Sequence, residues 1–345
     1  MSLLTTSIAW LAPLVSAHAN APVEPGAAAL DPVTIKIATV APEGSTWMNV
    51  LEDVKRQVYL RTRGRVNLRF YPGGIAGEEG TVLEKIHYGQ LHGAGLTGVG
   101  MGEILPASRI MELPFYFDDY ADYDYVLEAL RPEFEEGFRE NGFELLGWAE
   151  GGFANLYSRT SVADLELLRA SKVWLRTGDP LRAALLDALG IDPVPLALSD
   201  VLTSLQTGLV ETVYVSPLAL VALQWFPHLE HALALPVFNI QAGLVVDKEI
   251  FDSLSEADQA AVRTAAADGV ARLVELTRAD NAEAEEVLRE KGIVFATPDE
   301  ATRNALLEVR QAVAGALTGE VWDEELFARF ETLVAEARAA REESR

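Results

Sequence analysis

The segment KVWLRTGDPLRAALLDALG, residues 172–190, places a short strand directly before a helix. Lys172–Arg176 has an apolar centre and predicts a strand, and Leu181–Leu189 predicts a helix that Gly190 ends. A second helix over Asp200–Thr207, closed by Gly208, then leads into a strand over Thr212–Val215. The alternation of short strands and helices is typical of α/β proteins.

The same alternation occurs upstream. Val33–Val40 (VTIKIATV) predicts a buried strand, and Ser45 or Thr46 can cap the helix after it. Arg65–Tyr71 is a second strand with period-two alternation. We therefore expect α/β architecture with mostly parallel sheets. Further elements are expected as helices at Thr81–Tyr88 and Asp122–Asn141 (interrupted near Pro132) and as strands at Gly95–Val99, Phe143–Trp148, Asn155–Ser158 and Gly243–Val246.

The N-terminal residues indicate export. Residues 1–19 carry no charged side chain, and Ala17-His18-Ala19 fits the small-x-small rule for signal cleavage. The usual Lys/Arg region is absent, so a signal peptide with a misplaced start and a signal-like tail both stay open. Residues 20–32 are rich in Pro, Gly and Ala and predict a linker. A length of 345 residues predicts about two domains.

Composition excludes several classes of protein. There are 28 Lys and Arg against 52 Asp and Glu, a formal net charge of −24. Nucleic-acid binding and docking on anionic membranes both require clustered basic residues, so both are disfavoured. The sequence has no cysteine, which excludes disulfide frameworks, thiolate nucleophiles and iron–sulfur clusters.

A long apolar stripe follows Ser255, which can cap a helix, and continues to Gly292 without proline. At about 1.5 Å per residue, a helix of about 36 residues would reach about 54 Å. One interpretation is a single helix lying across both domains. The other is two helices broken near Asp280-Asn281.

Motifs for catalysis or cofactor binding are weak. Residues 93–98 (GAGLTG) match GxGxxG, but a helical pattern precedes them and no clear helix follows, so no dinucleotide site is expected. His228 and His231 have no acidic partner, and the acidic run of residues 118–124 lacks the glycine and terminal Glu of a calcium loop. We therefore expect no metal, no cofactor and no catalytic nucleophile with its base.

A series of ordered segments resembles a known family. The chain is similar, from about Ile35 to about Arg338, to the DctP-type solute-binding subunit of tripartite ATP-independent periplasmic (TRAP) transporters. The segments that carry the resemblance are TVAPEGSTW (39–47), RVNLRFYPGGIAGEE (65–79), GQLHGAGL (89–96), MELPFYF (111–117), KVWLRTGDP (172–180) and GIDPVPLALSDVLTSLQTGLVE (190–211).

The resemblance implies a two-lobed periplasmic-binding-protein fold with mixed, mostly parallel sheets, hinge strands and a long helix spanning both lobes. Lobe 1 would comprise 33–154 and 241–282, and lobe 2 would comprise 155–240 and 283–345. It implies a periplasmic receptor that captures a small organic ligand between the lobes and delivers it to TRAP membrane subunits. The alternatives are a receptor that presents its ligand to a sensor, and an α/β enzyme acting on a similar ligand.

The resemblance breaks at the residues expected to contact ligand. Where the family has an arginine that pairs with a substrate carboxylate, spacing from Lys172 gives Trp174, and Arg176 stands two residues later. A second family arginine corresponds to Ala154 or Asn155, and a family Asn before Pro corresponds to Ser216. These departures resemble a divergent branch that works with a periplasmic TPR-repeat partner and takes less polar ligands.

Two ligand classes therefore remain. Trp174 could form the wall of an apolar pocket, or Arg176 could bind a carboxylate from a shifted position on the same strand face. The spacing and the lost polar contacts favour a mainly apolar ligand. Such a ligand could still carry one acidic group that meets Arg176. Aromatic residues crowd the same region, as ligand pockets require. The further expected ligand contacts are Trp47, Tyr214 and Phe238.

Overall fold

The protein is represented by a computed structural model, which describes residues 32–343. The expected signal peptide (1–19) and residues 20–31 of the expected linker lie outside the described residues.

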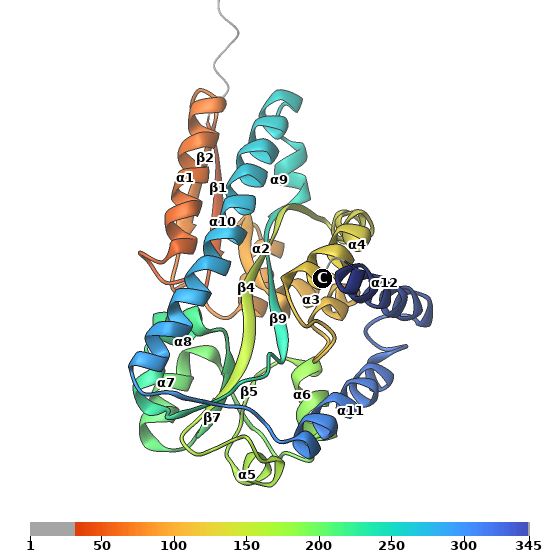
Figure 1. The fold of residues 1–345 in the computed structure, drawn as a ribbon. Helices are drawn as coiled ribbons and strands as arrows, with labels where there is room; N and C mark the ends of the chain where they lie inside the picture. The colour runs from red at the N-terminus through yellow and green to blue at the C-terminus, as the bar shows by residue number, and fades with distance from the viewer. Residues whose placement is uncertain (1–31, 344–345) are drawn as a thin grey trace, which may run out of the picture. The chain divides into compact units, whose positions relative to one another are not determined.

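An eight-stranded mixed sheet organises the described chain (Figure 1), in the order β10-β8-β4-β9-β3-β1-β2, with β7 also paired to β4. β1 is parallel to both β2 and β3, whereas β9 is antiparallel to β3 and β4. The two-stranded sheet β5-β6 is parallel. The strands are β1 (Val33–Thr39), β2 (Val66–Tyr71), β3 (Gly93–Thr97), β4 (Phe143–Ser158), β5 (Trp174–Arg176), β6 (Val194–Leu196), β7 (Thr212–Val215), β8 (His231–Leu233), β9 (Phe238–Asp247) and β10 (Val294–Ala296).

The predicted α/β class with mixed sheets is confirmed, but parallel pairs do not predominate. Four strand pairs are parallel and four antiparallel among residues 32–343, and every antiparallel pair includes β4 or β9. These are the two long strands, which run past each other from Phe143/Asp247 to Ala154/Phe238. They form the hinge, because β4 pairs with β9 at one end and with β7 and β8 at the other.

The expected break between Trp148 and Asn155 is a bulge within one strand. β4 continues for 16 residues, and its register against β9 shifts between Glu150 and Gly152. A bulge interrupts the period-two pattern without ending the ladder, so the sequence resembles two strands.

Helices cover both faces of the sheet (Figure 1). Besides the long α10, they are α1 (Thr46–Arg61), α2 (Glu79–His87), α3 (Gly98–Ile104), α4 (Tyr120–Glu140), α5 (Leu165–Ala170), α6 (Pro180–Ala188), α7 (Val201–Thr207), α8 (Pro217–Ala222), α9 (Lys248–Asp252), α11 (Glu300–Leu317) and α12 (Glu324–Glu343), with 3₁₀ turns at Pro106–Glu112, Leu198–Asp200 and Phe226–His228.

The long helix α10 (Glu256–Glu290) is a single helix of 35 residues, which confirms the first of the two interpretations. It lies against α1 near one end, crosses β4, and reaches α8 near the other (Figure 1). No break occurs at Asn281, because its buried amide donates to the carbonyls of Thr277 and Gly151 and accepts from the Leu218 N–H. This side chain therefore ties the helix to the hinge strand β4 and to α8.

Two local predictions were wrong. α4 continues through Pro132, because Leu130 and Phe134 on either side are fully buried and packing holds the helix despite the missing donor. A helix does follow the GxGxxG match, since α3 begins at Gly98 directly after β3. The first glycines of the match lie inside β3 itself rather than in a turn after a strand, so the arrangement still differs from a dinucleotide site.

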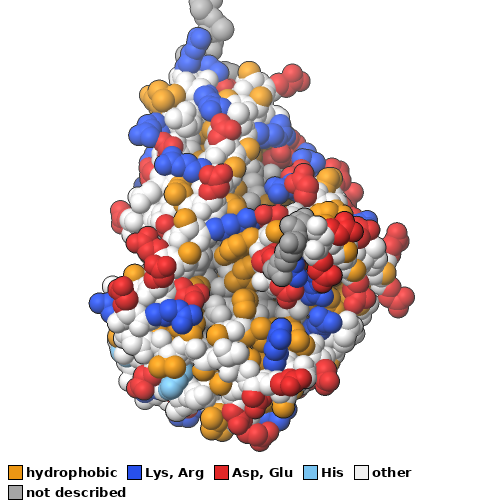
Figure 2. Space-filling model, in the orientation of Figure 1, with side chains coloured by type: hydrophobic (Ala, Val, Ile, Leu, Met, Phe, Trp, Pro, Cys, Tyr) orange, Lys and Arg blue, Asp and Glu red, His pale blue; other side chains and the backbone are white. Residues whose placement is uncertain are grey.

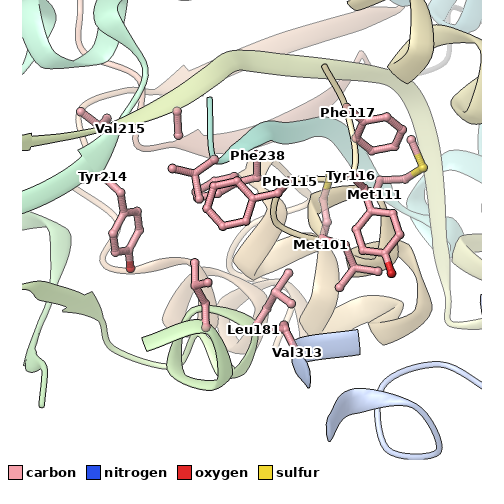
Figure 3. Packing of buried hydrophobic residues seen from close by; sticks show 14 of the residues in the cluster. Met101, Met111, Phe115, Tyr116, Phe117, Leu181, Tyr214, Val215, Phe238 and Val313 are labelled. Atoms are coloured by element: carbon pink, nitrogen blue, oxygen red, sulfur yellow. The ribbon is translucent and has the colours of Figure 1, made fainter. Parts of the chain in front are cut away.

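One large buried cluster runs from the hinge into the helices around it. Figure 3 shows Tyr214 at the left, Phe238 and Phe115 in the middle, and Tyr116 and Phe117 at the right, within the same packed group. A second cluster fills the space between β1, β2, α1 and α10. The first cluster takes residues from both ends of the sheet, so the two lobes share packed apolar surface where they meet.

The last two helices of the described chain pack on different neighbours. α11 packs on α6, but α12 packs on α4. Arg338 donates to the Tyr116 carbonyl at 2.7 Å, and Arg341 pairs with Asp118 and Asp119 beside the start of α4. Residues 324–343 therefore pack beside α4, whereas α11 packs beside α6.

Candidate ligand-binding site

A cavity of about 410 Å³ lies where loops from both ends of the sheet meet the hinge. The β1–α1 loop and the β3–α3 junction form one side, the β5–α6 and β7–α8 segments form the other, and β9 contributes its buried face. The lining side chains are mainly apolar: Val40, Ala41, Pro42, Trp47, Leu96, Val99, Trp174, Leu198, Tyr214, Val215, Leu218, Ala219, Ala222, Leu223, Phe238, Ile240 and Ala242.

Aromatic rings form one wall of the cavity. Trp174 stacks on Tyr214, with ring centroids 5.0 Å apart and planes at 18°, and meets Trp225 edge to face at 5.5 Å. Tyr214 in turn contacts Phe238 edge to face at 6.0 Å. Trp174 begins β5 and Tyr214 lies in β7, whereas Phe238 begins β9. This wall offers an apolar, polarisable surface.

The polar atoms of this wall are engaged by backbone. Trp174 Nε1 donates to the Leu196 carbonyl at 3.0 Å, and the Tyr214 hydroxyl accepts the Arg176 N–H at 3.0 Å. Burial and the nearby Asp179 carboxylate raise the pKa of Tyr214 well above its ordinary value, so the phenol is neutral at physiological pH.

Arg176 is buried at the cavity edge and is already paired. Its Nη2 lies 3.1 Å from Glu79 Oε2 and 3.6 Å from Glu78, and its Nη1 donates to Thr97 Oγ1 at 2.8 Å. Burial opposes the charge, but Glu79, Glu78 and Asp179 outweigh it and raise the pKa of Arg176. The guanidinium is therefore charged, with its charge matched by Glu79 across the cleft.

Arg182, the other arginine that lines the cavity, is also paired. It is 1% exposed, and its Nη1 and Nη2 donate to the carbonyl and the carboxylate of Glu112 at 3.0 and 2.9 Å. Its guanidinium also lies over the Phe238 ring. Burial lowers the pKa of Arg182, and the neighbouring Glu112 and Asp179 carboxylates oppose that shift.

A third arginine completes the buried network from behind. Arg109 Nη2 lies 2.7 Å from Asp179 Oδ1 and 3.0 Å from Glu112 Oε2. Together Arg109, Arg176 and Arg182 balance Glu79, Glu112 and Asp179, three charges of each sign. Gly98 leaves room for the Glu112 carboxylate, because a Cβ at position 98 would lie 2.4 Å from it.

Six of the seven residues predicted to contact ligand lie together on the cavity lining: Trp47, Trp174, Arg176, Tyr214, Ser216 and Phe238. Ser216 caps α8, where its hydroxyl accepts the Ala219 N–H. Their role in binding stays a prediction. Asn155 does not line the cavity: it is buried in β4, and its Nδ2 donates to the Leu233 carbonyl at 3.0 Å, joining β4 to β8.

Sequence reasoning missed the carboxylates that pair with the arginines. Glu79 stands in GEEGTVL, beside another Glu, and Glu112 stands between apolar residues in RIMELPF; both are 3% exposed. A charged residue flanked by apolar ones, as in RIMELPF, is the signal that could have found Glu112. Nothing in the sequence indicates that Glu79 reaches Arg176, which lies 97 residues away.

Comparison with known proteins identifies the family. Residues 37–317 match the bacterial extracellular solute-binding proteins of family 7, the DctP family. The chain belongs to this family. It is 30% identical, over 278 residues, to a solute-binding protein of Verminephrobacter eiseniae, a match that covers 77% of this chain and 79% of the relative.

Solved structures show the same fold. A TRAP periplasmic solute-binding protein of Ralstonia eutropha superposes with a TM-score of 0.81 at 21% identity, covering 88% of this chain and 99% of the other. One of Xanthobacter autotrophicus gives 0.79 at 20% identity, with 87% and 99% covered. This DctP-family protein is therefore a solute-binding receptor and not an enzyme, as the resemblance implied, and it has the two-lobed fold of the solved TRAP solute-binding proteins.

Residues 32–343 contain neither a membrane-crossing helix nor a cluster of metal ligands. None of the helices found there combines the length and the apolar character needed to cross a bilayer. No group of three or more His, Asp or Glu side chains in the same part of the chain is arranged to hold a metal ion. On the face shown in Figure 2, acidic and basic side chains are interspersed, with small apolar patches between them.

Proposed function

We propose that this receptor captures a small, mainly apolar and uncharged organic molecule. One observation carries the proposal: both arginines that line the cavity already have a buried carboxylate partner, Arg176 with Glu79 at 3.1 Å and Arg182 with Glu112 at 2.9 Å. A ligand carboxylate entering this cavity would lose its hydration and find no unpaired cation to compensate.

The cavity lining supports the same ligand class. Trp174, Tyr214 and Phe238 provide aromatic surface, and most of the remaining lining is aliphatic. A volume of about 410 Å³ is within the range of small-molecule sites, in which a few polar groups orient an otherwise apolar ligand. The N–H groups at the start of α1, beside Thr46 and Trp47, can supply that orientation.

The solved relatives provide a contrast. The Ralstonia eutropha protein was crystallised with (S)-2-acetolactate and the Xanthobacter autotrophicus protein with β-D-galacturonate, each of which carries a carboxylate. The resemblance implies that an arginine meets such a group, and Trp174 occupies that position in this chain. A change of ligand class accounts for the substitution.

The test is to identify the molecule that co-purifies with the protein and to measure its affinity by calorimetry. Mass spectrometry of the denatured receptor should release an uncharged, largely apolar compound, and that compound should rebind the emptied protein. Recovery of a carboxylic acid that rebinds more tightly than its amide would contradict the proposal.

We also infer the location and the partners. The signal-like residues 1–19 and the family support a periplasmic receptor that delivers its ligand to TRAP membrane subunits.

We infer a TPR-repeat protein as an additional periplasmic partner, on the resemblance to the divergent branch. Co-purification at low and at physiological salt tests this, because a chain with net charge −24 should bind a basic partner more weakly as salt rises. A genome without a TPR gene beside the transporter genes would contradict it.

For the lobes, we propose 33–154, 241–282 and 324–343 as lobe 1, and 155–240 with 283–317 as lobe 2. The packing of α12 on α4 supports the C-terminal assignment. Limited proteolysis followed by mass spectrometry tests it: a cut between α11 and α12 should leave residues 324–343 bound to fragments that contain α4.

A further inference from the structure

We propose that Glu79 is a specificity-determining residue, which neutralises Arg176 and thereby excludes carboxylate ligands from the cavity. This inference rests on the proposed function, in which the ligand is uncharged. It assigns the exclusion of acids to one residue. The Glu79 carboxylate pairs with Arg176, which is the cation that a ligand carboxylate would need.

The Glu79 carboxylate is fixed independently of Arg176. Glu79 begins α2 and is 3% exposed. Its Oε1 accepts the Thr97 N–H at 2.6 Å, and its Oε2 accepts the Thr97 hydroxyl at 2.8 Å and the Gly100 N–H at 3.0 Å. These three donors belong to the β3–α3 junction, on the same side of the cavity as α2. The carboxylate is therefore held in place by lobe 1 alone.

Arg176 comes to this carboxylate from the opposite side. It ends β5, where its backbone N–H is bound by Tyr214, and its side chain crosses to Glu79 and to Thr97 Oγ1. Both Arg176 and Thr97 line the cavity. A ligand carboxylate could bind the guanidinium only by competing with Glu79, which three other hydrogen bonds hold beside it.

The substitution Glu79→Gln removes the charge of the side chain and keeps its size and shape. The single side-chain oxygen of the glutamine can take the Oε2 position and accept the Gly100 N–H and the Thr97 hydroxyl, while its NH2 group replaces the Oε1 that accepts the Thr97 N–H. The amide carries no charge for Arg176. The nearest remaining carboxylate, Glu78, lies 3.6 Å from Arg176 and is half-exposed, so it compensates weakly. Glu79→Gln should therefore leave a buried, under-compensated cation at the cavity edge.

The experiment compares four proteins: wild type, Glu79→Gln, Glu78→Gln and Glu79→Gln/Arg176→Met. Glu78→Gln is the matched control, since it removes an adjacent carboxylate that is further from Arg176 and makes no side-chain cap to α2. The probes are acetate and the pairs benzoate with benzamide and 4-methylpentanoate with 4-methylpentanamide. Binding is measured by calorimetry at pH 7, and far-UV circular dichroism and the unfolding temperature show that each variant is folded.

We expect Glu79→Gln to bind the carboxylates roughly 10- to 100-fold more tightly than wild type, and the amides within about threefold. Glu78→Gln should change the carboxylate affinities less than about threefold. The double variant should lose the gain, because the cation is absent. An unchanged carboxylate affinity in a folded Glu79→Gln protein, or a gain that survives removal of Arg176, would overturn the inference.

Failure of the proposed function gives a different result. If wild type binds a carboxylate more tightly than the matching amide, the uncharged-ligand proposal fails whatever Glu79→Gln does. If wild type prefers the amides and Glu79→Gln gains no acid affinity, the proposed function stands and the role of Glu79 is refuted. If wild type binds none of the probes, acetate binding by Glu79→Gln still decides the role of Glu79, since a freed guanidinium needs only the carboxylate.

Discussion

The indole of Trp174 lies stacked on the phenol of Tyr214, with centroids 5.0 Å apart and planes inclined by 18°. The polar atom of each ring is bound to backbone, Nε1 to the Leu196 carbonyl and the hydroxyl to the Arg176 N–H. What this pair presents to the cavity is therefore aromatic surface. The strand position at which the family resemblance implies an ion pair forms part of an apolar wall instead.

Replacement of Trp174 should weaken ligand binding. Trp174→Leu removes a stacked ring from the cavity wall, and we expect a loss of about 2 kcal/mol or about 30-fold in affinity for the co-purified ligand, measured by calorimetry. Trp148→Leu is the matched control, because Trp148 is also buried and stacked, on Phe134 at 5.5 Å, but lies outside the cavity lining. It should lower the unfolding temperature and leave affinity within about twofold. Equal affinity losses in both variants would show that Trp174 acts only through stability.

Ligand binding should close the cleft. Glu79 and Arg176 approach from opposite sides of the cavity, and the long strands β4 and β9 together with α10 run from one side to the other. A ligand that touches both sides favours the closed form over the open one. Small-angle scattering should therefore show a smaller radius of gyration when the co-purified ligand is added back to emptied protein. An unchanged radius, with the emptied protein already closed, would contradict this prediction.

Ionisation of Asp122 and ionisation of Asp258 should have opposite effects on the stability of the fold. Each is the third residue of a helix, α4 or α10. Burial, followed by the neighbouring Asp119, raises the pKa of Asp122 above the ordinary 3.8. The hydrogen bond from Arg65 lowers the pKa of Asp258 below it, with Ser255 contributing and burial opposing.

The signs follow from linkage. A raised carboxyl pKa means that ionisation weakens the fold above that pKa, so Asp122→Asn should raise the free energy of unfolding at pH 7 and lose this advantage by pH 4. A lowered pKa means that ionisation stabilises the fold until pH falls through that pKa. Asp258→Asn should therefore lower the free energy of unfolding at both pH values. Urea unfolding at pH 7 and pH 4 measures both. A destabilising Asp122→Asn at pH 7 would show that its pairing with Arg341 outweighs burial.

The contact between α1 and α10 depends on Gly269. A Cβ at this position would lie 2.2 Å from Val54 Cγ2, so Gly269→Ala should lower the free energy of unfolding by about 1–3 kcal/mol through overpacking. A Cβ at Gly315 in α11 would meet no atom within 4 Å, and Gly315→Ala should raise stability by up to about 1 kcal/mol through helix propensity. Urea unfolding of both variants is the measurement. A stabilised Gly269→Ala protein would mean that the two helices separate without loss.

Several features could be predicted because they depend on neighbours in sequence. Ser45 and Ser255 are N-caps as expected, since a capping side chain needs only the N–H groups of the next turn. The apolar stripe after Ser255 gives one helix, and the clustering of Trp174, Tyr214 and Phe238 was expected from aromatic content and from the resemblance. The bulge in β4 and the continuity of α4 past Pro132 were missed, because tertiary packing overrides a local signal at both places.

The sequence by itself determined the α/β class, the cap and apolar stripe of α10 and the position of Trp174 where the family resemblance implies an arginine, because periodicity, capping and spacing are local properties. Only the tertiary structure decided that Arg176 and Arg182 are already neutralised, and that α12 returns to α4. Charge pairing depends on distances between atoms far apart in the chain, such as the 97 residues between Glu79 and Arg176, and burial sets how strongly such a pair excludes another anion.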